Sequence, residues 1–269
     1  VYGRNGDTPI PVLAASSSGE CFDMAVEGVR IALRHMTPVI LLVDGYLSNA
    51  SEPWLIPIVE ALAPIESHAA PDASGGPSSQ MLASQRDPDS LGRPWITPGM
   101  KGLVYRTGGL EKDFDTGHIS YEADNHQRMT DLRADKVARV ADFIPEQQVE
   151  VGADEGRLAV VGWGSTYGAI YQAVRQVASV DPRVSHIHLR YLNPFPRNLP
   201  ELLGRFDRVL VPEMNAGQLS TVLRDKLGID PIPLTKVTGQ PFSIAELVSA
   251  IREELGENAA VRGVAGESR

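Results

Sequence analysis

Short apolar runs alternate with helix-spaced apolar stripes over residues 157–256, which predicts a compact α/β domain with a mostly parallel sheet. The runs expected to form strands are Leu158–Gly162, Val184–Leu192, Arg208–Pro212 and Ile232–Val237. Helices are expected at Thr166–Val177, Leu199–Arg205 and Gly217–Leu227, and a last one behind the capping box Ser243-x-x-Glu246.

The first part of the chain has the pattern of a single βαβ unit. Pro9–Ala15 and Pro38–Asp44 are short apolar runs, and the second is so continuously apolar that we expect a parallel strand covered on both faces. Between them, the capping box Ser17-x-x-Glu20 begins a helix that is expected to run to about His35. The stripe expected to face the core is Phe22, Ala25, Val26, Val29, Ala32, Leu33 and Met36.

The middle of the chain is less regular. Pro64–Arg93 is rich in Pro, Ser, Gly, Asp and Ala without periodicity, so we expect it to wrap the surface or a partner chain instead of filling the core. A helix is expected over Gln127–Ala141 and a linker over Phe143–Gly156. We therefore divide the chain into an incomplete α/β domain (1–126), a helix and linker (127–156), the second α/β domain (157–256) and a flexible tail (257–269).

Composition narrows the function classes. The 269 residues carry a net charge of −9, which argues against a nucleic acid or a membrane surface as partner. No apolar run approaches the ~18 residues of a membrane span, and no signal peptide opens the chain, which indicates the cytoplasm. The single cysteine, Cys21, excludes an iron–sulfur cluster built by this chain alone. Because the first residue is Val1, we expect a piece of a longer protein.

The glycines of Gly162–Gly168 follow a predicted strand and resemble a dinucleotide-binding fingerprint. That fingerprint needs a carboxylate at the end of the next strand, where this chain has Arg190-Tyr191-Leu192-Asn193-Pro194. We therefore favour a structural turn, in which Gly162 or Gly164 has a positive φ or packs closely against a neighbouring element. A nucleotide-binding module is the alternative.

Six ordered motifs resemble the alpha subunit of 2-oxoglutarate:ferredoxin oxidoreductase, also called 2-oxoacid:acceptor oxidoreductase. In the first half these are Tyr2–Asp7, Asp44–Leu47 with Ser51–Trp54, and Gly108–Glu111. In the second half they are Gly162–Gly168, His188–Pro196 and Val211–Leu219. The resemblance implies an incomplete pyrimidine-type thiamine-binding domain followed by a transketolase-C-terminal-like domain.

The resemblance also implies the chemistry: oxidative decarboxylation of a 2-oxoacid to an acyl-coenzyme A, with electrons passed to ferredoxin. Thiamine diphosphate, Mg²⁺ and a [4Fe–4S] cluster are then held mainly by a partner beta subunit, and this chain alone is expected to bind none of them. The family's catalytic glutamate and the residues that bind the substrate carboxylate have no counterpart here. We therefore expect no catalytic residue, no metal ligand and no turnover from this chain by itself.

Four residues are candidates for contact with substrate or cofactor: Arg4, Asn5, Ser17 and Asn49. They precede or follow the first two predicted strands, whose carboxyl ends should meet at one edge of the sheet. Two further alternatives stay open at this point, a transketolase-like protein and the beta chain of a 2-oxoacid dehydrogenase. Among substrates, the Tyr2–Asp7 and Pro212–Asn215 motifs favour 2-oxoglutarate.

Overall fold

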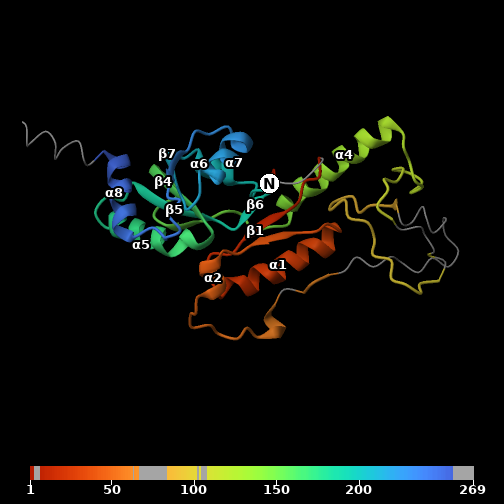
Figure 1. The fold of residues 1–269 in the computed structure, drawn as a ribbon, viewed down its shortest axis with the longest axis horizontal. Helices are drawn as coiled ribbons and strands as arrows, with labels where there is room; N and C mark the ends of the chain where they lie inside the picture. The colour runs from red at the N-terminus through yellow and green to blue at the C-terminus, as the bar shows by residue number, and fades with distance from the viewer. Residues whose placement is uncertain (3–6, 63, 67–83, 102, 104–107, 257–269) are drawn as a thin grey trace, which may run out of the picture.

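The computed structural model describes residues 1–2, 7–62, 64–66, 84–101, 103 and 108–256. Arg4 and Asn5, most of the irregular span Pro64–Arg93 and the tail 257–269 lie outside these residues. The chain forms two sheets that lie side by side, with the second half on the left of Figure 1 and the βαβ unit of the first half in its lower middle.

The second half contains a five-stranded sheet in the order β3-β5-β4-β7-β8. Its strands are β3 (Val149–Val151), β4 (Gly156–Trp163), β5 (Val184–Leu189), β7 (Phe206–Glu213) and β8 (Ile232–Thr235). All pair in parallel except β3, which is antiparallel to β5 and lies within the segment expected to be a linker. The helices are α5 (Tyr167–Ala178), α6 (Leu199–Leu203), α7 (Gln218–Leu227) and α8 (Ile244–Leu255). The α/β pattern predicted for this half is confirmed.

The central strand β4 shows why an unbroken apolar run forms this sheet. Successive side chains of a strand point to opposite faces. Leu158 and Val160 pack with α5 and α8, while Ala159 and Val161 pack with α6 and α7, and all four are fully buried. The capping box Ser243-x-x-Glu246 is present at the start of α8, as predicted.

The first half forms a three-stranded sheet in the order β2-β1-β6, where β1 is Val12–Ala14, β2 is Ile40–Leu42 and β6 is Tyr191–Asn193. β1 and β2 pair in parallel on either side of helix α1 (Glu20–His35), which confirms the predicted βαβ unit. The single strand expected at Val184–Leu192 is wrong. The chain breaks at Arg190 and passes from β5 of one sheet into β6 of the other, where it runs antiparallel to β1.

Because β6 and β1 connect the two halves, they also share a hydrophobic core. Val12 and Ala14 pack with Ala159 and Val161 of the second half, while Leu13 and its neighbours pack against α1. The boundary between 1–126 and 157–256 stays a prediction, but the structure places strand β6 of the second half within the first sheet.

Two packing predictions for the first half are wrong. The buried residues of α1 are Met24, Ile31 and His35, whereas Phe22 and Val29 of the expected stripe are exposed. The helix is apolar on two sides, and its own sheet covers only one. Likewise β2, expected to be covered on both faces, is an edge strand whose Ile40 and Leu42 are each 37% exposed.

The remaining elements connect these layers. A short helix α2 (Gly45–Asn49) follows β2 directly, and α4 (Ala123–Ala138) begins four residues before the predicted helix and continues into a 3₁₀ turn, Arg139–Asp142. The described end of the irregular span is anchored on α1, because the His35 Nδ1 lies 3.0 Å from the Ser90 carbonyl oxygen. Nearby, the Trp95 indole donates to the Leu33 carbonyl at 2.7 Å.

Candidate functional site

The loops after β1 and β2 meet at one edge of the first sheet, as expected for parallel strands. The Ser17 hydroxyl donates to Glu52 at 2.9 Å, and the Ser18 hydroxyl donates to the Leu47 carbonyl at 2.8 Å. Ser17 Oγ also accepts from the Glu20 N–H at 3.2 Å, which is half of the predicted capping box. The other half is different, because Glu20 accepts from the backbone of Ser16, and the helix begins only at Glu20.

Of the four candidate residues, Ser17 and Asn49 lie within the described part of the chain. Arg4 and Asn5 lie outside the described residues. Ser17 bonds to Glu52, and the exposed Asn49 side chain donates to the Gly45 carbonyl of its own helix at 2.7 Å. Both hydrogen bonds stabilise local structure. A role for these residues next to the substrate stays a prediction.

A cleft forms where the carboxyl end of β2 meets those of β4 and β7. Asp44, which caps α2 by accepting from the Leu47 N–H at 2.9 Å, also accepts a hydrogen bond from the Ser165 hydroxyl across the cleft. The cleft has a volume of about 390 Å³ and is lined by Leu42, Val43, Asp44, Trp163, Gly164, Ser165, Thr166, Met214, Asn215 and Gln218. In open α/β sheets ligands bind beyond the carboxyl ends of the strands. We therefore take this interdomain cleft as the candidate site.

The lining of the interdomain cleft indicates which ligand group it suits. It combines an indole and aliphatic side chains with hydrogen-bonding groups, and it has no Lys or Arg among its lining residues. Such a surface suits an uncharged ring or amide better than a diphosphate. A second hollow of about 490 Å³, next to Val1 and Tyr2, shares Leu42, Trp163 and Gln218 with the first.

Sequence reasoning did not select the cleft residues as site residues, although motifs contained them. Asp44, Ser165 and Asn215 lie in three separate motifs, and only the fold brings the three strand ends together. Their common signal was position: each lies at the last residue of a predicted strand or a few residues after it.

The turn Gly162–Gly168 has the structural features that were expected of it. Gly164 has a φ of +60°. At Gly162, a Cβ atom would lie 2.6 Å from the Ile170 Cδ1 and 3.0 Å from the His188 Nδ1. Gly164 therefore has a conformation that favours glycine, and a Cβ at Gly162 would displace neighbouring side chains, so the geometry predicted for a structural turn is confirmed.

Arg190, at the break between β5 and β6, connects the two halves electrostatically. Its Nε bonds to Glu20 of the first half, and its Nη1 lies 2.6 Å from the Glu150 Oε1 of the second. Tyr167 donates to the other oxygen of Glu150 at 3.2 Å. Glu20 and Glu150 raise the pKa of Arg190 against the opposing effect of burial, which lowers it.

Beneath Tyr167 lie two buried histidines, His186 and His188. Their rings are 5.6 Å apart, and that of His188 meets Tyr167 edge-on at 4.9 Å. Burial, with a smaller contribution from Arg190, lowers the pKa of His186 to about 3. Burial also lowers the pKa of His188 well below its ordinary value. Both rings are therefore neutral at physiological pH.

The motif around Glu213 and Asn215 builds the start of α7. The buried Glu213 carboxylate accepts from the N–H groups of Leu219 and Ser220 at 2.7 and 3.0 Å. The Asn215 side chain accepts from the N–H groups of Gly217 and Gln218, both at 2.9 Å. A negative charge at a helix N-terminus is stabilised by the helix dipole. Glu213 and Asn215 therefore have a structural role at the start of α7, in addition to the position of Asn215 at the cleft.

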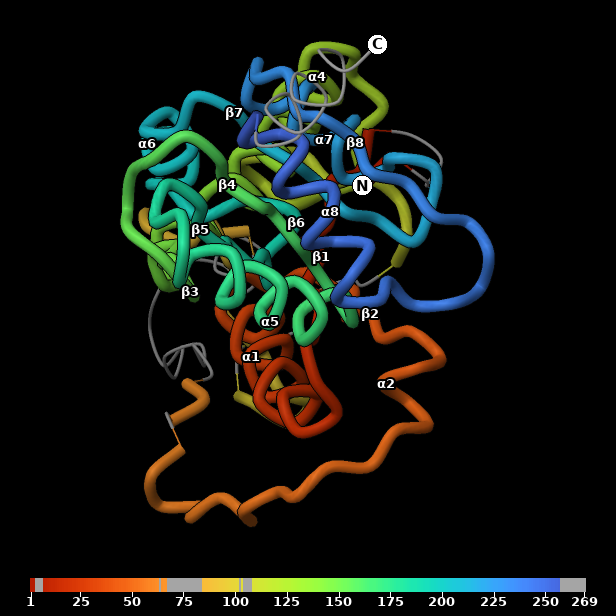
Figure 2. Tube along the Cα trace, turned by 90° about the vertical axis from the view of Figure 1, so that its left-hand side faces the viewer, coloured from red at the N-terminus to blue at the C-terminus, as the bar shows by residue number. Residues whose placement is uncertain are grey.

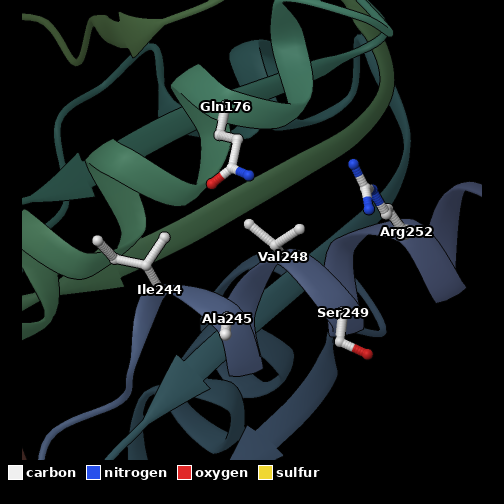
Figure 3. A pocket seen from close by; sticks show the side chains of 6 residues that line it. All are labelled: Gln176, Ile244, Ala245, Val248, Ser249 and Arg252. Carbon is white, nitrogen blue, oxygen red and sulfur yellow. The ribbon is translucent and has the colours of Figure 1, made fainter.

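A different hollow lies between α5 and α8, away from the strand ends (Figure 3). Its lining is Gln176, Ile244, Ala245, Val248, Ser249 and Arg252, and its volume is about 480 Å³. Its lining contains no acid, histidine or cysteine, so it offers no general base that could activate the Ser249 hydroxyl as a nucleophile.

Neither a metal cluster nor a membrane span is found in the described part of the chain. There, no group of three or more His, Cys, Asp or Glu side chains could hold a metal ion. None of the helices in the described ranges is long and apolar enough to cross a membrane. Because the cleft lining contains no Lys or Arg, it does not fit a diphosphate group; its indole and aliphatic side chains fit the uncharged ring of a thiamine-type cofactor.

The chain has an α/β fold with a cleft between its two sheets, and comparison with known proteins shows which proteins it resembles. Residues 2–108 match the family model described as pyruvate flavodoxin/ferredoxin oxidoreductase, thiamine diphosphate-binding. The chain is 44% identical over 255 residues to the 2-oxoglutarate oxidoreductase subunit KorA of Mycobacterium tuberculosis, covering 95% of this chain and 38% of that protein. It is 29% identical to subunit alpha of a 2-oxoacid:ferredoxin oxidoreductase of Aeropyrum pernix, covering 93% and 39%.

A solved structure shows the same fold. The 2-oxoglutarate:ferredoxin oxidoreductase of Magnetococcus marinus, with 2-oxoglutarate, coenzyme A and succinyl-CoA bound, matches with a TM-score of 0.84 at 29% identity over 94% of this chain and 44% of that chain. The resemblance to the alpha subunits of these oxidoreductases, inferred from six motifs, is therefore confirmed. The chain spans about two-fifths of the length of these relatives.

Proposed function

We propose that this chain forms part of the alpha subunit of a 2-oxoacid:ferredoxin oxidoreductase, with 2-oxoglutarate as the favoured substrate. The overall reaction converts 2-oxoglutarate, coenzyme A and two oxidised ferredoxins into succinyl-CoA, CO₂, two reduced ferredoxins and a proton. The observation that carries the proposal is the 44% identity to the subunit KorA, which extends over both sheets and both sides of the interdomain cleft.

Within that reaction, we assign the described residues at the cleft a binding and positioning role. Thiamine diphosphate, when bound in the complex, supplies the carbon at which the 2-oxoacid loses its carboxylate. The Asp44–Ser165 hydrogen bond fixes one sheet edge against the other, and Arg190 fixes the same two halves from a second point. We infer that these contacts fix the two halves relative to each other and so keep the shape of the cleft between them constant.

The cofactors and partners follow from this assignment. We propose that a cysteine-rich beta subunit supplies the diphosphate site, Mg²⁺ and a [4Fe–4S] cluster, because the single Cys21 cannot ligate a cluster. Ferredoxin and coenzyme A would act on the assembled complex. A cytoplasmic location agrees with this chemistry, since the cytosol keeps cysteine thiolates reduced.

The direct test is reconstitution. The complete alpha subunit that carries these residues, co-expressed anaerobically with the beta subunit, should reduce ferredoxin only when both 2-oxoglutarate and coenzyme A are present. Pyruvate and a branched 2-oxoacid serve as substrate controls, and this chain alone should give no turnover. A complex that instead transfers the acyl group to lipoamide, without reducing ferredoxin, would favour the 2-oxoacid dehydrogenase alternative.

The nucleotide-binding alternative has its own measurement. Titration calorimetry of the isolated chain with NADH and NADPH should show no saturable binding, because the next strand ends without the carboxylate that would hold the ribose and the cleft beside the turn has no Lys or Arg in its lining. Micromolar binding that Gly164→Ala abolishes would contradict the structural turn.

A further inference from the structure

The segment after α2 exposes a continuous row of large apolar side chains. Residues 54–59, here called the docking strip, contain Leu55, Ile56, Ile58 and Val59 with exposed fractions of 91%, 84%, 69% and 73%. Figure 2 shows this segment, in orange, standing away from the rest of the molecule. Monomeric proteins rarely present a contiguous apolar surface of this kind unless it is an interaction site.

The docking strip is anchored at its start. There, Glu52 accepts hydrogen bonds from the Ser17 hydroxyl and the Gly19 N–H, and the Trp54 ring packs on Phe22 with centroids 5.5 Å apart. At its end, a 3₁₀ turn runs from Val59 to Ala61. These contacts hold the start of the strip against α1, while the apolar side chains that follow are exposed.

The Phe22–Trp54 contact makes the docking strip continuous with the uncovered side of α1. Phe22 and Val29 on that side are 36% and 49% exposed. Along the strip, the N–H groups of residues 54–56 and 58 donate to no other described residue. The surface therefore offers apolar side chains together with backbone N–H groups that have no acceptor among the described residues, as extended segments do when a partner chain receives them.

Charge indicates what kind of partner fits. From Thr37 to Gln85 the sequence has no Lys or Arg, while Asp44, Glu52, Glu60 and Glu66 flank the strip. A second copy of this chain would place these carboxylates against each other, and an anionic membrane would repel them. A groove with apolar walls and a cationic rim would match both the strip and its flanks.

We propose that the docking strip and the outer side of α1 form one docking surface for a different polypeptide, which presents an apolar groove rimmed by Lys and Arg side chains. This inference rests on the proposed function, because it identifies the surface through which the chain joins the beta subunit. It explains why a contiguous row of apolar side chains is exposed along residues 55–59 of the isolated chain.

The test compares charged substitutions in the strip with the same substitution elsewhere. Leu55→Glu and Ile56→Glu are introduced into the complete alpha subunit, with Val180→Glu and Val237→Glu as controls at exposed apolar sites of 79% and 71%. Affinity for the beta subunit should fall at least tenfold for the strip variants and less than twofold for the controls. Glu60→Lys should weaken association at low salt and much less at high salt, because it removes a charge that faces the cationic rim.

The possible outcomes separate the two proposals. If wild-type subunits do not associate at all, the proposed function fails. If they form an active complex that both strip variants leave unchanged, the docking surface is wrong and the proposed function stands. A strip-dependent homodimer in light scattering, strip-dependent binding to phosphatidylserine vesicles, or photocrosslinking of Ile56→benzoylphenylalanine only to other parts of the alpha chain would each overturn the docking proposal.

Discussion

In the five-stranded sheet, Leu158 and Val161 of β4 are fully buried, because helices cover both faces. In the three-stranded sheet, β2 is just as apolar, yet Ile40 and Leu42 lie at an uncovered edge. The sequence pattern of the two strands is the same, and only their neighbours differ. A continuous apolar run therefore indicates that a strand will be covered, but it does not tell which polypeptide covers it.

The largest difference in stability between the two sheets is expected when one leucine in each is replaced by alanine. Leu158→Ala removes a fully buried side chain and should lower the free energy of unfolding by about 2–5 kcal/mol. Leu42→Ala, at the exposed edge, should cost less than about 1 kcal/mol in the isolated chain. Urea unfolding of both variants measures this contrast. Equal losses would mean that β2 is covered in solution.

A second prediction concerns the Arg190 contacts between the halves. A double-mutant cycle of Glu20→Gln and Arg190→Gln should give a coupling energy of about 1–3 kcal/mol, because the pair is partly buried. The exposed pair Asp142 and Arg197 is the matched control and should couple by less than about 1 kcal/mol. If the coupling energy of Glu20 and Arg190 is no greater than that of the control pair, this ion pair does not help to hold the halves together.

The third prediction concerns how the stability of the chain depends on pH through the buried histidines of the second half. The pKa of His186 is lowered to about 3 in the folded state, so between that value and about 6.5 the unfolded chain binds a proton that the folded chain does not. Stability should therefore be constant above pH 7 and fall as the pH drops, by up to about 1.4 kcal/mol per pH unit for each buried histidine.

The matched variants for this pH dependence are His186→Gln and, at an exposed position, His118→Gln. The first should flatten the stability profile between pH 5 and 7, while the second should leave it unchanged. Urea unfolding at each pH gives the profile. If His186→Gln kept the wild-type slope, protonation of this residue would not contribute to acid unfolding.

The smallest effect is expected at the glycine turn. Gly164→Ala places a Cβ on a residue with a φ of +60° and should lower stability by about 1 kcal/mol. Gly168→Ala is the control, because it lies in the first turn of α5 with nothing within 4 Å of the added Cβ. Thermal unfolding should show a lower Tm for the first variant only. Unchanged stability in Gly164→Ala would contradict a structural need for glycine.

The second half was predictable because its signals are local. Strand and helix alternation, the capping box at Ser243 and the glycine turn each depend on residues close in sequence. The sheet switch at Arg190 was not predictable, because apolar residues continue across it and only the ion pairs with Glu20 and Glu150 show why the chain turns there.

Less of the candidate site was predictable, for a physical reason. That loops meet at the carboxyl ends of β1 and β2 follows from parallel topology, and the Ser17–Glu52 hydrogen bond confirms it. The cleft itself depends on how two sheets face each other, as the Asp44–Ser165 contact shows. The prediction of the buried stripe on α1 was wrong because the helix has two apolar sides. Sequence periodicity does not show which of the two sides the chain itself covers.

The contrast between the halves can be measured directly by hydrogen exchange of the alpha subunit, alone and in the active complex with the beta subunit. The amides of Leu55, Ile56 and Ile58 should exchange rapidly in the isolated subunit and at least tenfold more slowly in the complex, since they have no acceptor among the described residues. Amides of β4 and β5 should be protected equally in both states. An active complex in which the strip exchanges as fast as in the isolated subunit would contradict the account.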